Sequence, residues 1–216
     1  MSLIQEDFQT VFPDVGLEDR VVWCFDPNST FPINSAWNSM RRKGTEVHWH
    51  KILWFRPRIP NHCFMSWLAL HNRLSALDRV KRWKHSIGSL CVLYHMGEES
   101  RNHSLLSCTY SKSIWNSILL LNGERRTCRD WNYEIKWTLR GKSLQVVVTR
   151  RLSWHAHLYY VWQARIDFIL SDVSPSTERT LVKIKAAVQY RLCGVKGLEQ
   201  KVTNARQKQM LLNWVA

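Results

Sequence analysis

The chain has 216 residues, of which 45% are hydrophobic, and its 31 Lys and Arg against 17 Asp and Glu give a formal charge of +14. The hydrophobic content excludes a wholly disordered chain and suffices for one domain with a core plus appendages. The positive charge favours polyanionic partners, nucleic acid first among them, because neutralising phosphates releases bound counterions.

Residues 1–14 are acidic and polar, unlike a secretory signal peptide, and polar residues interrupt every apolar cluster before it could span a bilayer. Six cysteines stand at uneven spacings, which indicates reduced thiols and not a secreted disulfide framework. We therefore expect a nuclear or cytoplasmic protein without a membrane partner.

The N-terminal part is predicted to contain a poorly ordered leader and one small β-hairpin. Residues 1–18 form the leader, and the β-prone run 20–25 is followed by turn residues at 26–30. Phe31-Pro32-Ile33 would return as the second strand, with Pro32 confined to an edge position. Such a hairpin must pack on helices to be stable.

From Asn34 onward the spacing of apolar residues predicts helices, one of which opens at Pro60. Residues 86–108 interrupt this rhythm and are rich in Ser, Gly, His and Cys, and helical spacing then returns until Asn122-Gly123. The longest predicted helix covers residues 144–170, and a last one ends at Gly194. The predicted fold is mainly α, with an N-terminal β-hairpin, an irregular zinc-knuckle-like insert and two longer C-terminal helices.

The insert contains candidate metal ligands at Cys91, His103 and Cys108, three of the four that a structural zinc site requires. The expected first-half partner would stand at position 94, where Tyr94 is no ordinary zinc ligand. Three outcomes remain open: His95 supplies the fourth ligand, water fills that position, or no metal binds and packing holds the loop.

Several separate elements of the sequence recur in the order of one known family. The insert has Cys91, Glu98-Glu99, His103 and Cys108 ahead of a helix that carries Trp115. Upstream are Trp49-x4-Trp54, Arg58-Ile-Pro60, Trp67-Leu68 and Asn72-Arg73-Leu74, and downstream is the segment Tyr159 to Arg165. These elements resemble the zinc-binding domain at the C-terminal end of plant LINE-type reverse transcriptases, over roughly residues 19–170 and most strongly over 49–115.

The resemblance implies a retrotransposon-derived accessory domain with a structural zinc, which binds template RNA or target DNA beside a reverse transcriptase. The chain is predicted to divide into a leader (1–18), a zinc-binding-like domain (19–122), a basic loop (123–142), a helical extension (143–194) and a tail (195–216). An open zinc position would also permit catalysis with Glu98 or Glu99 as a base, but the family's site is structural.

Catalytic patterns are not evident elsewhere. Polymerase chemistry needs clustered carboxylates for two metal ions, and the chain has no Asp-Asp dipeptide. We therefore expect no enzyme and no small-molecule substrate.

Nucleic-acid binding is predicted for the densest basic runs, with RNA or DNA bound without sequence preference. Solvated helix faces would give the same pattern, and the alternative function is an inactive structural remnant or a protein-interaction scaffold. Most of the twelve tryptophans are expected in the core and one to three on a binding surface. The candidate binding residues are Arg41, Arg42, Arg73, Arg79, Lys81, Arg82 and Lys84.

Overall fold

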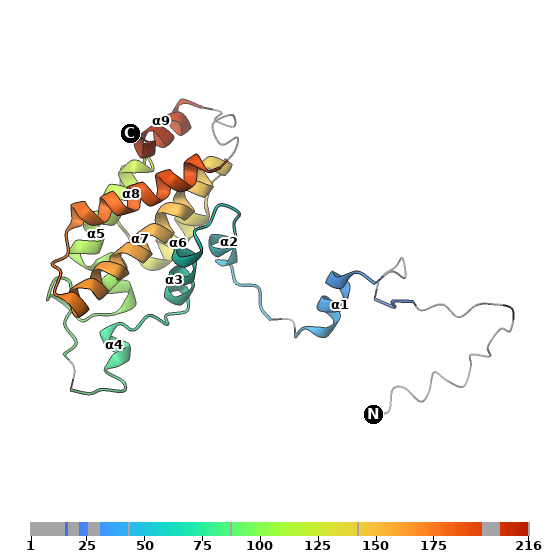
Figure 1. Cartoon of the computed structure of the whole chain (residues 1–216), viewed down its shortest axis with the longest axis horizontal. Coiled ribbons are helices and arrows are strands. Elements are labelled where there is room, and N and C mark those ends of the chain that lie inside the picture. The colour runs from blue at the N-terminus through green and yellow to red at the C-terminus, as the bar shows by residue number, and fades with distance from the viewer. Residues whose placement is uncertain are drawn as a thin grey trace. The chain divides into compact units, whose positions relative to one another are not determined.

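The computed structural model describes residue 16 and residues 22–25, 31–42, 44–86, 88–141, 143–195 and 204–215. The chain divides into two compact units, residues 1–46 and 47–216 (Figure 1). The first unit contains α1 (Ile33–Met40). The second contains α2 (His50–Leu53), α3 (Pro60–Leu70), α4 (Leu77–Val80), the π-helix η2 (His103–Ser107), α5 (Thr109–Leu121), α6 (Trp131–Leu139), α7 (Leu144–Ser171), α8 (Thr177–Cys193) and α9 (Ala205–Val215).

The mainly helical prediction is confirmed, but the predicted N-terminal hairpin is not supported. Among its described residues, 22–25 form no strand and Ile33 already begins α1. Pro32 takes the N-cap position in extended geometry and its carbonyl accepts from the backbone N–H of Ser35. A proline without an N–H is better suited to opening a helix than to pairing in a ladder. The rest of the hairpin, and the leader apart from residue 16, lie outside the described residues.

Side-chain contacts, and not a ladder, link the described parts of the first unit. The Trp23 indole donates to Ser35 Oγ at 2.8 Å, and that hydroxyl donates to the Phe25 carbonyl. The Trp23 ring also meets the Phe31 ring edge-on at 4.8 Å. The segment before α1 is thus fixed by aromatic and hydroxyl contacts.

Helix α7 forms the axis of the second unit. It begins where Ser143 Oγ accepts from the Val146 N–H and ends at Asp172, which adopts the left-handed conformation with φ 51°. Helices α3, α5, α6 and α8 and the π-helix all contact it, and Figure 1 shows α8 running beside it. The predicted domain limits at residues 122 and 142 fall inside this unit, because α7 and α8 complete the core that α3 and α5 begin.

Tryptophans fill the centre of this core. The Trp115 ring lies edge-on to Trp154 at 5.2 Å and to Trp137 at 5.8 Å. Six of the twelve tryptophans are buried, and each large ring removes much apolar surface from water. Those clearly exposed are Trp37, Trp54 and Trp83.

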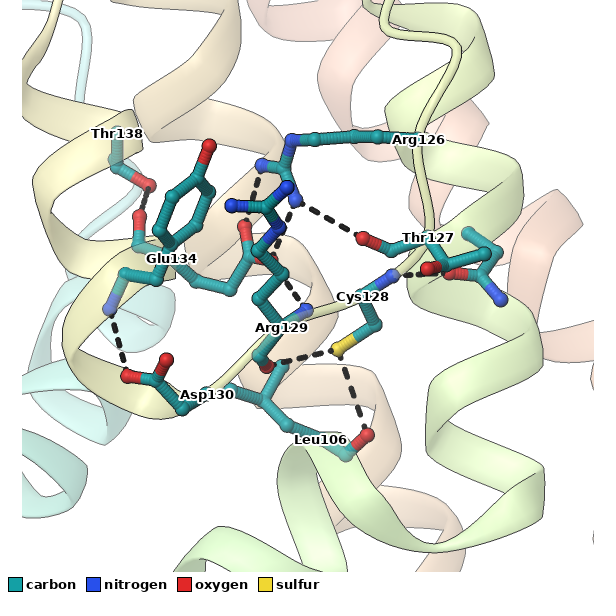
Figure 2. Close-up of polar contacts among 10 residues, drawn as sticks. Leu106, Arg126, Thr127, Cys128, Arg129, Asp130, Glu134 and Thr138 are labelled. Atoms are coloured by element: carbon teal, nitrogen blue, oxygen red, sulfur yellow. Dashed lines mark hydrogen bonds and ion pairs between the residues drawn. The ribbon is translucent and has the colours of Figure 1, made fainter.

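The predicted basic loop over 123–142 contains a helix, α6, and its charge is partly used inside the protein (Figure 2). Asp130 caps α6 by accepting from the Tyr133 N–H at 3.0 Å. Buried Glu134 accepts two hydrogen bonds from Arg126, both 2.7 Å, and a third from the Arg129 N–H. One of the basic residues of this predicted loop, Arg126, thus neutralises an internal carboxylate.

The predicted tail also contains a helix, α9, which packs against α5 and α8. Its Met210 and Trp214 side chains are buried in the common core. None of the helices in the described ranges combines the length and apolar character of a bilayer span.

Helices α3 and α7 each bury a histidine with a lowered pKa, His62 on α3 and His155 on α7. Burial lowers the pKa of His62 to about 4 and that of His155 to about 3, and the charges of His62 and Arg151 add to the effect on His155. Unfolding returns both imidazoles to a pKa near 6.5, so the unfolded chain binds more protons at mildly acidic pH. Stability is therefore fully present above about pH 6.5 and falls as the pH drops toward about 4.

We expect His155→Leu to flatten this acid sensitivity. Each buried neutral histidine lowers the free energy of unfolding by about 1.4 kcal/mol per pH unit in this range. Urea unfolding of the parent and the variant between about pH 7 and about pH 5 measures the difference, in which contributions common to both proteins cancel. Equal pH dependence in the two proteins would contradict the assignment.

Candidate metal centre

The first half of the site is a tight loop, residues 91–97, that is closed by an antiparallel bridge between Leu90 and Glu98. The Cys91 N–H donates to the Gly97 carbonyl at 2.9 Å, and the His95 N–H returns to the Cys91 carbonyl at 2.7 Å. Gly97 has φ 75°, and a Cβ there would lie 3.1 Å from the His103 ring. The absence of a side chain at Gly97 therefore allows the loop to lie directly against His103.

The second half of the site joins two helices. His103 begins the π-helix, and Cys108 stands at its end and at the N-cap of α5. The Cys108 N–H donates to the His103 carbonyl at 2.7 Å, which closes this turn. Single π-turns are frequent at functional sites, and this one brings the side chains of His103 and Cys108 to the same place.

The three predicted ligands Cys91, His103 and Cys108 converge. Their ligand atoms all lie within 4.8 Å of one another, and the two sulfurs are 3.8 Å apart. Two thiolates bound to one tetrahedral zinc at about 2.3 Å each would be separated by about 3.8 Å. His103 Nε2 is buried without a hydrogen-bond partner, a costly state that a metal bond would relieve. The residues present thus fit a zinc ion.

The electrostatics favour a thiolate at the start of α5. The hydrogen bond donated by Cys91, together with the backbone N–H groups of Tyr110 and Ser111, lowers the pKa of Cys108 to about 6 against the opposing effect of burial. The same hydrogen bond and burial raise the pKa of Cys91, against the backbone N–H groups of Tyr94 and Leu93. Backbone donors aimed at both sulfurs support the thiolate form that binds metal.

The structure does not bring His95 into this group. His95 is exposed with φ 54°, and its ring lies 6.3 Å from the Phe168 ring. The Tyr94 side chain is also exposed, although its backbone N–H supports Cys91. Among the described residues, the cluster contains the three candidate ligands Cys91, His103 and Cys108. His95 could supply a fourth ligand only if its side chain turned toward them, so its role as a ligand stays a prediction.

Glu99 acts as a structural anchor beneath the site. Its buried carboxylate accepts from Arg165 Nε and from a terminal Arg165 nitrogen at 2.6 Å, and also from the backbone N–H groups of Leu77 and Val92. The Arg165 guanidinium in turn covers the Trp162 ring. The carboxylate is thus committed to four donors that join the insert to α4 and α7, which does not suit a general base.

The predicted nucleic-acid residues are not all brought together. Arg41 and Arg42 belong to the first unit and are exposed. Arg79 donates to the Asn72 carbonyl. Of the predicted residues in the second unit, four are exposed, one after the end of α3 and three after α4, namely Arg73, Lys81, Arg82 and Lys84.

Comparison with known families agrees with this geometry. Residues 31–115 match the family described as zinc-binding in reverse transcriptase. This segment is therefore similar to the zinc-binding domain of reverse transcriptases, and it runs from α1 into the first half of α5 with all three converging residues. No curated protein matches the chain, and no solved structure does. Arg165 lies beyond the matched segment, although it is the partner of Glu99.

Proposed function

We propose that this chain is a non-catalytic zinc-binding domain that binds nucleic acid as an accessory to a reverse transcriptase, derived from a plant LINE-type retrotransposon. The observation that carries the proposal is the convergence of Cys91, His103 and Cys108 inside a segment that matches this family. We place its action in the nucleus or cytoplasm, beside a polymerase.

The zinc would have a structural role. Cys91, His103 and Cys108 would hold it, and the ion would supply a cross-link between the insert and the N-terminus of α5. The fourth position would be filled by His95 or by water. Glu99, the nearest candidate base, is engaged with Arg165, which favours a site without chemistry.

Nucleic-acid binding rests on charge and exposure. The chain carries +14, and the side chains of Lys81, Arg82 and Lys84 extend into solvent from the segment after α4. Phosphate neutralisation of this kind gives binding without sequence preference to RNA or DNA.

A salt series tests this proposal. Fluorescence anisotropy of a labelled single strand should show an affinity that falls linearly with the logarithm of salt concentration. We expect Lys84→Gln to reduce the slope by about 0.7–0.9, whereas Lys183→Gln, an exposed lysine on α8, leaves it unchanged. An affinity that does not respond to salt would overturn the nucleic-acid role.

The second candidate is an inactive remnant or protein-interaction scaffold with a degenerate metal site. Tyr94 at the expected ligand position favours it. Polymerase motifs in the reading frame just upstream, together with absent nucleic-acid binding, would support this candidate.

A further inference from the structure

An aromatic groove opens on the surface of α2 and α3. It has a volume of about 480 Å³ and is open to solvent. Trp54 and Phe64 are 65% and 59% exposed, which is unusual for large apolar rings and marks a surface available to a partner. The lining residues are Leu53, Trp54, Arg58, Pro60, Cys63, Phe64 and Trp67.

The rings form a continuous row along α3. Phe64 and Trp67 are nearly parallel, with an interplanar angle of 19° and centroids 6.0 Å apart. Trp67 then contacts His71 at 4.9 Å, and His71 contacts Trp49 at 5.1 Å. Residues 64, 67 and 71 are spaced i, i+3 and i+7, in steps of three and four that put side chains on one helix face.

Cationic side chains flank the row. The Arg58 guanidinium carbon lies 5.5 Å from the Trp54 ring centre, and that of Arg73 lies 5.6 Å from the Trp67 ring centre. The sequence from residue 47 to residue 77 has four Lys or Arg, namely 51, 56, 58 and 73, and no Asp or Glu. Such a surface is complementary to a polyanion, and an apolar peptide would leave its charge unused.

We propose that this groove is a single-strand binding platform, on which unpaired bases stack against Trp54, Phe64 and Trp67 while Arg58 and Arg73 contact phosphates. Base faces are accessible in single strands and covered in a duplex, so open aromatic rings select the former. The inference rests on the proposed nucleic-acid function. Of the groove residues, only Arg73 is among the candidate binding residues chosen from the sequence, so the groove locates this function at a place that charge alone did not indicate.

The test uses the full chain with a labelled oligouridine of about 12 nucleotides. We expect Trp54→Ala and Phe64→Ala each to weaken binding about tenfold, as the loss of one stacking partner does. Tyr190→Ala, which removes an even more exposed ring on α8 outside the groove lining, should leave the affinity unchanged. Circular dichroism of each variant shows that the surface changes preserve the helices.

A second readout locates the bases directly. Photo-crosslinking with 5-iodouridine in the same strand should label peptides that contain Trp54, Phe64 or Trp67. If the parent binds with salt dependence but the groove variants bind equally well, or a duplex competes as well as the single strand, the platform is wrong and the proposed function stands. If the parent binds no strand at all, the proposed function itself fails. Cross-links confined to other peptides would likewise overturn the platform.

Discussion

Cys108→Ser is expected to abolish stoichiometric zinc binding, whereas the purified parent carries about one zinc per chain. The Cys108 sulfur lies 3.8 Å from the Cys91 sulfur, and Cys108 is the N-cap residue of α5, so the substitution removes the candidate ligand that would tie the insert to the helix. Complete structural zinc sites contribute about 10–16 kcal/mol in small zinc-finger peptides, so loss of the ion should lower the thermal midpoint strongly. Elemental analysis and thermal unfolding measure the two effects.

The matched control is Cys193→Ser, an exposed cysteine at the end of α8. It should retain both zinc and stability. Zinc content that is equal in Cys108→Ser and Cys193→Ser, or absent from the parent, would contradict a site at these three residues.

His95→Ala separates the two ways of completing the site. If His95 turns inward as the fourth ligand, its removal should weaken zinc binding sharply. If water fills the fourth position, the variant should bind zinc as the parent does, consistent with the exposed position of the His95 ring beside Phe168. Both results leave the three converging ligands in place.

The convergence of Cys91, His103 and Cys108 could be predicted from sequence because it depends on local spacing. Cys91, His103 and Cys108 lie within 18 residues, and the π-turn between the last two needs no distant partner. The helices with long apolar periodicity, α7 and α8, were likewise predictable, since a period of 3.6 survives any tertiary arrangement.

The failures have identifiable causes. Helix α6 was hidden by the basic residues before it, although Asp130 is a favourable N-cap and Trp131 and Ile135 share a face. The predicted strand ending at Ile33 gave way to α1, because local β-propensity is weak next to a helix start. The Glu99–Arg165 pair spans 66 residues and has no local signature, so only the fold reveals it.

Glu99→Gln is expected to lower the free energy of unfolding by about 3–5 kcal/mol, the usual cost of breaking a buried ion pair by removing one charge. Both side chains are almost fully buried, so the Arg165 charge would be left without compensation in the core. Gln has nearly the same shape as Glu, but its side-chain NH2 group would face the N–H donors that now bind the Glu99 carboxylate. The substitution therefore tests charge and hydrogen bonding, and not packing. Chemical denaturation at constant zinc measures the change.

Glu98→Gln is the neighbouring control, since the Glu98 side chain is exposed and accepts a long hydrogen bond of 3.5 Å from Ser89 Oγ. Its effect should stay within about 0.5 kcal/mol. Adding Arg165→Leu to Glu99→Gln should recover part of the lost stability, because the stranded charge disappears with its partner.

The pair should also influence the metal centre. Glu99 Oε2 accepts from the Val92 N–H at 3.1 Å, directly after the ligand Cys91, so the carboxylate fixes the loop that presents that sulfur. Loss of such a supporting contact typically weakens metal affinity about 10–100-fold. Competition with a chromophoric chelator should therefore show weaker zinc binding in Glu99→Gln than in Glu98→Gln. Equal stability and equal zinc affinity in the two variants would show that α7 does not anchor the insert through Glu99, and that the matched segment forms its metal site without the helices that follow it.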